Sequence, residues 1–157
     1  MKQLIRMAIV AGAVAWSIRP FPTSRIVDRF ETLAQSPASV GDGVYTEGQA
    51  TRGRSAFLAQ SCVRCHGETL AGNEFGPTLV GAEFVGKWSG MSVADLFTLI
   101  HETMPQDNPG RLSTQQAADI LAYLLKGNGF PAGQTELSRN PSVLKTITIE
   151  QKPTPSR

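Results

Sequence analysis

The sequence predicts an all-α domain, and two patterns carry that prediction. Three polar quartets have the form of a capping box, in which a Ser or Thr is followed three residues later by an acidic or amide side chain. The apolar residues after each quartet recur with a period near 3.6, which is typical of an amphipathic helix. No stretch alternates convincingly with the period of two that a half-buried strand requires.

The three quartets place helices over residues 46–61, 92–104 and 113–127. Pro105 stops the second helix because proline cannot continue the backbone hydrogen bonds, and Gly127 is placed to end the third. The inward faces of these helices are apolar or small: Ala50, Gly53, Phe57 and Leu58 in the first, Leu96, Phe97 and Ile100 in the second, and Ala117, Ile120, Leu121 and Leu124 in the third.

Residues 67–90, between the first two helices, are rich in glycine. So many glycines disfavour regular structure but suit a backbone that wraps closely around a flat group. A proline and three large apolar residues in the same segment argue against a floppy loop: Pro77, Leu79, Phe84 and Trp88. We therefore expect an irregular but ordered segment here.

The N-terminus, residues 1–15, predicts an export signal. Lys2 and Arg6 precede the apolar run 7–16, and the tripeptide Ala13-Val14-Ala15 supplies small residues for cleavage near its end. An uncleaved anchor is the alternative, although the apolar residues number about 12, fewer than the ~20 that a membrane-spanning helix needs. The expected location is the periplasm.

The rest of the chain is expected to form three parts. Residues 16–45 predict a mostly irregular linker, residues 46–130 the helical domain, and residues 131–157 a tail that lies on the surface or is disordered. Loss of the signal removes two of the 15 basic side chains, which leaves 13 against 13 acidic ones. This balance excludes the basic footprint typical of nucleic-acid-binding proteins.

Both cysteines and one of the two histidines lie together in the stretch Cys62-Val63-Arg64-Cys65-His66. Cys-x-x-Cys-His is the attachment signature of c-type haem, in which each sulfur adds across a vinyl group and the histidine ligates the iron. In a helical turn Cys62, Cys65 and His66 project from one side. A haem would also supply the large apolar body that 7% aromatic residues do not. The sequence thus predicts one covalently bound haem c.

Two other uses of the same residues remain as alternatives. A thioredoxin-like dithiol would need the motif at the start of a helix that follows a strand, whereas this motif follows a predicted helix. Structural zinc would need four protein ligands, and after Cys62, Cys65 and His66 only His101 remains among the histidines and cysteines.

Met104 is the predicted second axial ligand of the iron. It lies just beyond a capped helix, directly before Pro105, in the turn-rich segment 103–110 that can cross the far face of a haem. Met91 and His101 are the other candidates for this position. A thioether ligand raises the reduction potential, and a filled sixth position keeps oxygen from the iron. Both effects favour an electron carrier over an enzyme.

Four stretches resemble single-haem class I cytochromes c. They are the CVRCH motif, GPTLVG at 76–81, TMPQDNPG at 103–110 and ILAYLL at 120–125. The resemblance covers about residues 46–130 and implies a cytochrome c fold, with three or more helices wrapped around one covalently attached haem. It also implies that the first and last helices cross where Gly53 and Phe57 meet Ile120 and Tyr123.

The same resemblance implies the roles of three residues in the haem pocket. Pro77 matches a proline whose neighbouring backbone carbonyl accepts a hydrogen bond from the ligating histidine, which fixes the ring. Leu79 would pack beside the ring. Trp88 would lie near a haem propionate.

The downstream stretches NGFPAG at 128–133 and TELS at 135–138 are similar to cytochromes associated with quinoprotein (PQQ) alcohol or sugar dehydrogenases. This similarity implies a periplasmic one-electron carrier that cycles between Fe(II) and Fe(III), with a quinoprotein dehydrogenase as donor and an oxidase or another cytochrome as acceptor. A haem-binding subunit of a larger dehydrogenase complex is one alternative. A five-coordinate haem enzyme or sensor is another, if Met104 does not ligate. The balanced charge predicts partner recognition that depends little on salt.

Overall fold

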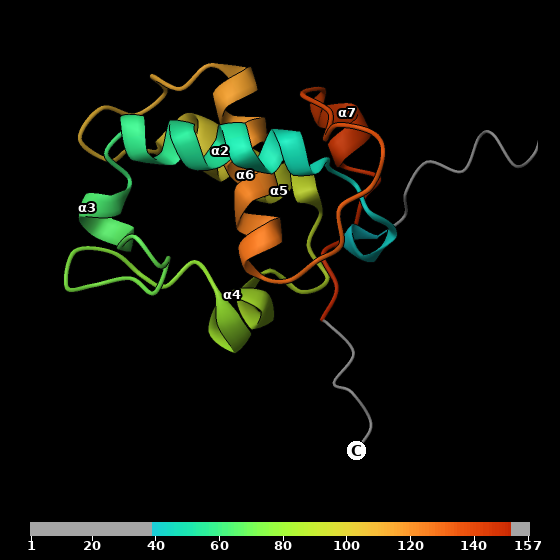
Figure 1. Cartoon of the computed structure of the whole chain (residues 1–157), viewed down its shortest axis with the longest axis horizontal. Helices are drawn as coiled ribbons and strands as arrows, with labels where there is room; N and C mark the ends of the chain where they lie inside the picture. Colours follow the sequence, from blue (N-terminus) through green and yellow to red (C-terminus); the bar gives the residue numbers. More distant parts are fainter. Residues whose placement is uncertain (1–38, 152–157) are drawn as a thin grey trace, which may run out of the picture. The chain divides into compact units, whose positions relative to one another are not determined.

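The computed structural model describes residues 39–151, which form helices joined by loops (Figure 1). Its elements are η1 (Val40–Asp42), α2 (Glu47–Ala59), α3 (Val63–His66), α4 (Gly81–Trp88), α5 (Val93–Thr103), α6 (Thr114–Gly127) and α7 (Pro141–Leu144). Extended pairing within this range is limited to isolated bridges. The predicted all-α class is confirmed. The predicted signal and most of the predicted linker lie outside the described residues, as do residues 152–157.

The caps predicted from the sequence start the three main helices. Ser92 and Ser113 each form a complete capping box at the start of α5 and α6. At the start of α2, Thr46 accepts a hydrogen bond from the Gln49 backbone, but the Gln49 side chain does not return to the cap. It is fully buried and bonds the backbone of Leu137 instead, so only half of this predicted box forms.

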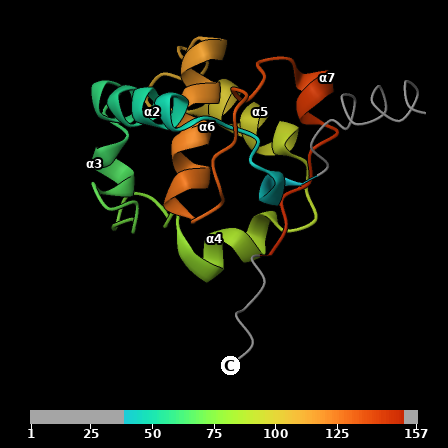
Figure 2. The ribbon, with the colours of Figure 1, turned by 45° about the vertical axis from the view of Figure 1, so that its right-hand side comes forward.

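Helices α2 and α6 cross in direct contact, as both ribbon views show (Figures 1 and 2). A Cβ atom on Gly53 would lie 1.8 Å from the backbone oxygen of Asp119, so only glycine permits this approach. One turn away, the rings of Phe57 and Tyr123 pack edge to face at 5.6 Å. The predicted crossing of the first and last helices is therefore present, with buried Ile120 on the same helix as Tyr123.

An ion-pair network on one side of this crossing joins α2 to α6 and to Glu136. Arg52 binds both carboxylate oxygens of Asp119, at 3.1 and 3.2 Å, and also lies 2.8 Å from Glu136. Asp119 is buried and takes a third hydrogen bond, of 2.7 Å, from Gln115. The bidentate geometry satisfies a carboxylate that would be costly to bury alone.

The prediction that residues 131–157 form a surface or disordered tail is wrong for residues 131–151, which pack onto the domain. Four side chains in this segment are buried: Leu137, Leu144, Ile147 and Ile149. Thr148 bridges to Ser39 on one side and to Ser92 on the other. Figure 2 shows this red segment leaving α7 and running past the cyan η1. Its buried residues follow no regular period. Leu137 bonds the Gln49 side chain of α2, and Ile147 and Ile149 pair through their backbones with residues 90–93.

The domain also begins earlier than expected. Val40, Val44 and Tyr45, assigned to the linker, are buried. The Tyr45 hydroxyl donates a 2.7 Å hydrogen bond to the backbone oxygen of Phe130, which ties the start of the domain to the end of α6. Within residues 39–151 no helix is long and apolar enough to cross a membrane.

Helix α4 corrects the expectation of irregular structure over 67–90. Phe84 and Trp88 lie four residues apart and are both buried, so this helix has one apolar face. Gly86, within the helix, faces open space. A glycine weakens a helix by about 1 kcal/mol relative to alanine, which two buried aromatic side chains outweigh.

Candidate functional site

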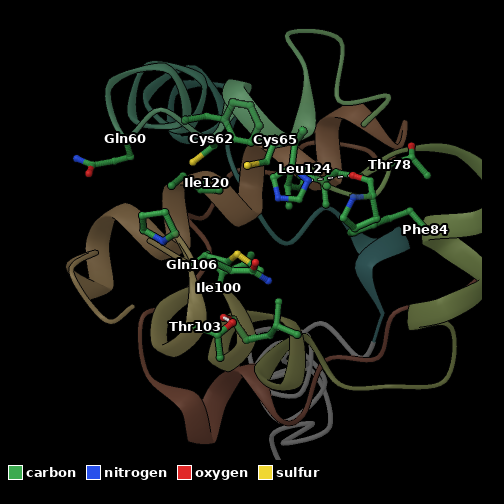
Figure 3. Close-up of a pocket in the computed structure, with 18 of the residues that line it drawn as sticks. Gln60, Cys62, Cys65, Thr78, Phe84, Ile100, Thr103, Gln106, Ile120 and Leu124 are labelled. Atoms are coloured by element: carbon green, nitrogen blue, oxygen red, sulfur yellow. Dashed lines mark hydrogen bonds between the residues drawn. The ribbon is translucent and has the colours of Figure 1, made fainter. Parts of the chain in front are cut away.

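A cavity of about 680 Å³ opens between α3, α4, α5 and α6 (Figure 3). Its wall is mostly apolar, with contributions from Leu96, Ile100, Ile120 and Leu124. All seven residues that the sequence assigned to a haem site line it: Cys62, Cys65, His66, Pro77, Leu79, Trp88 and Met104. The start and body of α3, the loop before α4, the end of α4 and the residue after α5 thus place these residues around one space.

The two cysteines reach the cavity because the chain turns sharply between α2 and α3. Ser61 adopts a left-handed conformation with φ of 61°, and the Cys62 backbone then donates to Phe57 at 3.1 Å. Figure 3 shows both sulfur atoms, of Cys62 and Cys65, on the cavity side of the chain. Both thiols are free. Burial raises the pKa of the Cys62 thiol above its ordinary value.

His66 is oriented by a backbone carbonyl of the loop that follows the Cys-x-x-Cys-His motif. Its Nδ1 lies 2.9 Å from the carbonyl oxygen of Pro77, the contact that the resemblance implied. With Nδ1 engaged, Nε2 is the nitrogen available to a metal. A Cβ on Gly76 would come within 2.9 Å of the Cys65 backbone oxygen, so glycine lets the two segments approach closely.

Met104 stands at the end of α5, where it lines the cavity. Its N–H donates to Ile100 at 3.2 Å and its backbone is extended, which turns the chain out of the helix. Figure 3 places Ile100 and Thr103 across the cavity from Cys62 and Cys65. The end of α5 therefore faces the Cys-x-x-Cys-His segment from the opposite side.

The other two candidates for the sixth position do not line the cavity. Met91 is 39% exposed and precedes α5. His101 stacks on Phe97, with ring centroids 5.7 Å apart and an interplanar angle of 9°. Of the three candidates that the sequence left open, the fold brings only Met104 to the site.

Trp88 and Leu79 form part of the wall near α4. Trp88 is buried beside Phe84, and the Lys87 ammonium group lies 5.5 Å from its ring centroid. Sequence reasoning missed Leu99 and Leu112, which also line the cavity. Leu99 lies three residues after Leu96, a helical spacing that is a usable signal for it.

Two contacts cross the rim of the cavity, between the segment 60–66 and the loop that follows Met104. Arg64 lies 3.9 Å from Asp107, and Arg111 donates a 3.2 Å hydrogen bond to the backbone oxygen of Gln60. All of these side chains are exposed or half-exposed, so each contact stabilises little by itself.

The residues present fit a covalently attached haem. Two thiols, an imidazole with one nitrogen anchored and a thioether surround an apolar space of a size that holds cofactors. The alternatives fit less well. Within residues 39–151 no group of three His, Cys, Asp or Glu side chains is placed to hold a metal such as zinc. The thiols also follow helix α2, not the strand that a thioredoxin-like site requires.

Comparison with known proteins agrees with this geometry. Residues 48–124 match the family model described as cytochrome C oxidase, cbb3-type, subunit III. No curated protein and no solved structure matches the chain. The matched segment runs from α2 to near the end of α6 and contains the whole cavity-lining set. Residues 48–124 therefore form a cytochrome c domain, which supports a class I c-type cytochrome and implies covalently bound haem c and a role in electron transport between redox proteins.

Proposed function

We propose that the protein is a periplasmic one-electron carrier with a single haem c, attached through Cys62 and Cys65 and ligated by His66 and Met104. One observation carries the proposal. The thiols and imidazole of one segment and the thioether of another line the same cavity, although 38 residues separate His66 from Met104 along the chain. The single Cys-x-x-Cys-His motif supports one haem.

When bound, the haem supplies an iron that alternates between Fe(II) and Fe(III). The protein's own groups make that exchange fast and reversible. Cys62 and Cys65 fix one edge, and the Pro77 carbonyl holds His66 so that its orientation does not change with charge. A neutral thioether from Met104 favours the ferrous state. Apolar side chains such as Leu96 and Ile100 exclude water, which limits reorganisation around the iron.

A quinoprotein dehydrogenase is the proposed donor, and an oxidase or another cytochrome the proposed acceptor. The stretches 128–133 and 135–138 support the donor by their similarity to cytochromes associated with such enzymes. In this domain they pack against the residues that follow η1 and against α2. The Gly133 N–H donates to the Tyr45 oxygen at 2.7 Å, and Leu137 bonds the buried Gln49 side chain. The rate of reduction by such a donor is expected to change little with ionic strength, because basic and acidic side chains nearly balance.

The substitution Met104→Ala tests the ligand set. The ferric wild-type protein is expected to show the weak red-end band of methionine-ligated iron, and Met104→Ala to lose it and to lower the reduction potential. Met91→Ala is the matched control, since Met91 lies outside the cavity wall, and it should keep the band. High-spin ferric iron in the wild type would overturn the proposal in favour of a five-coordinate enzyme or sensor.

A further inference from the structure

Phe75 is the most exposed large apolar side chain among residues 39–151. It is 71% exposed, against 43% for Val143, 41% for Leu58 and 39% for Met91. Phe75 also belongs to the cavity lining, so it stands where the cavity meets the surface. Isolated exposed apolar residues are common, but a phenylalanine this exposed at the mouth of a functional cavity is a candidate contact residue for a partner protein.

Hydrogen bonds from Asn73 hold the backbone turn that contains Phe75. The Asn73 side-chain oxygen accepts from the Phe75 N–H at 2.8 Å, and its amide nitrogen donates to the Arg64 backbone at 2.9 Å. Its backbone pairs with Gly76 in both directions, at 2.9 and 3.3 Å. The backbone of Phe75 is thus held relative to the Cys-x-x-Cys-His segment before any partner arrives, which lowers the entropy cost of ordering this turn on binding.

The next residue, Gly76, brings this turn against Cys65. A Cβ on Gly76 would lie 3.0 Å from the Cys65 Cβ, so the turn packs directly on the proposed attachment site. A protein that covers Phe75 is therefore brought to the edge of the cavity where the thioethers are proposed to form. Electron transfer requires close approach at such an edge.

The charges that line the cavity cancel. Arg64 and Asp107 lie 3.9 Å apart, and α4 contributes one acidic and one basic side chain, Glu83 and Lys87. Exposed Glu74 beside Phe75 and Arg111 at the rim add one charge of each sign, so the balance is kept and gives no long-range field to steer a charged partner. An encounter complex at this face is therefore expected to be held by short-range apolar contact.

We infer that Phe75 anchors a docking surface for a redox protein whose own docking face is apolar and nearly uncharged. The inference rests on the proposed carrier function and names the chemistry of its partner. A rigid aromatic residue that becomes buried on binding is typical of interface hot spots. Transient redox complexes bury little area, so one such anchor is a large share of the contact.

The test compares Phe75→Ser with the wild type in the haem-loaded protein. One oxidant is a blue-copper protein with an apolar, uncharged patch at its copper edge, and the second is ferricyanide, which needs no docking surface. We expect the second-order rate constant with the copper protein to fall about tenfold, a loss of ~1.4 kcal/mol in the encounter complex. The rate constant with ferricyanide should change by less than about twofold. The reduction potential of the variant is measured alongside, so that a change in driving force is separated from a change in docking.

Val143→Ser is the matched control, because Val143 is 43% exposed on α7 and does not line the cavity. It should leave both rate constants unchanged. Equal rate constants for Phe75→Ser and wild type with the copper protein would refute the inference. So would a loss confined to electron self-exchange between two copies of the chain, which would make a second copy the occupant. Neither result touches the carrier function, whose failure would appear as a missing methionine band.

Discussion

The α2–α6 crossing and the cavity differ in what fills their interiors. At the crossing the two helices touch, and Gly53 leaves no room for even a methyl group beside Asp119. At the cavity the walls stand apart around about 680 Å³, and α3 has no buried residue. The two regions lie next to each other and share α2 and α6, yet only the first is completed by side chains of the chain itself.

This difference separates the part of the domain that stabilises the fold, at the crossing, from the part that carries the candidate site, at the cavity. The crossing and the segments 39–45 and 131–151 supply buried apolar side chains and satisfied polar groups. The side of the cavity that residues 60–80 form consists instead of a short helix and turns held by hydrogen bonds to one another, such as those of Asn73 and His66. Stability is therefore expected to reside in the first region and ligand chemistry in the second.

The substitution Gly53→Ala should break the crossing and have the largest effect on stability. Alanine is favoured over glycine in a helix by about 1 kcal/mol, but its Cβ would overlap the Asp119 oxygen and force the helices apart. We expect a net loss of about 3 kcal/mol in the free energy of unfolding, measured by denaturant titration of the haem-loaded protein.

Gly48→Ala is the control for that measurement, because it lies in the same helix and its nearest neighbour would be 3.9 Å away. It should stabilise the protein slightly. A Gly53→Ala protein as stable as the wild type would show that the crossing is not close-packed in solution.

Gln49→Ala should be next in size. Gln49 is fully buried and bonds both the N–H and the carbonyl of Leu137, at 2.6 and 3.1 Å. Its removal leaves two buried backbone groups unpaired, which costs about 2 kcal/mol in the free energy of unfolding. Thermal unfolding measures the loss, with exposed Gln134→Ala as the control. An unchanged melting temperature would mean that the 131–151 segment does not depend on this contact.

Ser92→Ala should have a smaller, pH-dependent effect of about 1 kcal/mol at neutral pH. The hydrogen bonds from Ser92 lower the pKa of Asp95, the side-chain bond being the larger cause. A lowered folded-state pKa contributes stability above the unfolded value, near 4, and that contribution is lost as the pH falls through the folded value. The difference from wild type should therefore shrink in acid.

Ser113→Ala provides the comparison for this titration, because its capping box uses Gln116, which does not titrate. Denaturant titrations at about pH 7 and about pH 3 should show a pH-dependent loss for Ser92→Ala and a constant one for Ser113→Ala. A constant loss for both would contradict the role given to Asp95.

Asn73→Ala should change the free energy of unfolding least, by under about 0.5 kcal/mol, because it is exposed and lies in the cavity region. Its effect should be local. The amide of Phe75 loses its acceptor and should exchange with solvent several-fold faster, as hydrogen exchange measures. A large drop in global stability would show that the two regions are not energetically distinct.

The parts of the fold that local signals determine were predictable from the sequence. Caps at Thr46, Ser92 and Ser113 and the apolar periods after them place α2, α5 and α6 within a few residues. Helix α4 was missed because its glycines mask its single buried face. The packing of 131–151 was missed because its buried residues pair with distant segments, which no local period records. Leu137 bonds Gln49, and Ile147 and Ile149 pair with residues 90–93.

The candidate site divides in the same way. The placement of Cys62, Cys65 and His66 at one cavity was predictable because Cys-x-x-Cys-His is a haem-attachment spacing. The placement of Met104 there was predictable because a proline follows it at the end of a helix; the ligand roles of all four stay predictions. The placement of Leu112, buried and lining the cavity from a loop, depends on the tertiary fold alone. The same is true of the exposure of Phe75, which no pattern in residues 67–80 indicates.

The pairing of Ser39 with Thr148 has a consequence for engineering. The Val40 N–H donates to the Thr148 oxygen at 3.0 Å, so the chain enters and leaves the domain along adjacent, parallel stretches. Paired stretches of this kind lie about 5 Å apart. Residue 151, the last one described, lies only three positions beyond Thr148, and domains whose ends lie close together tolerate insertion and circular permutation. We therefore expect residues 39–151 to accept insertion into a surface loop of a host protein and to carry the proposed haem site with them.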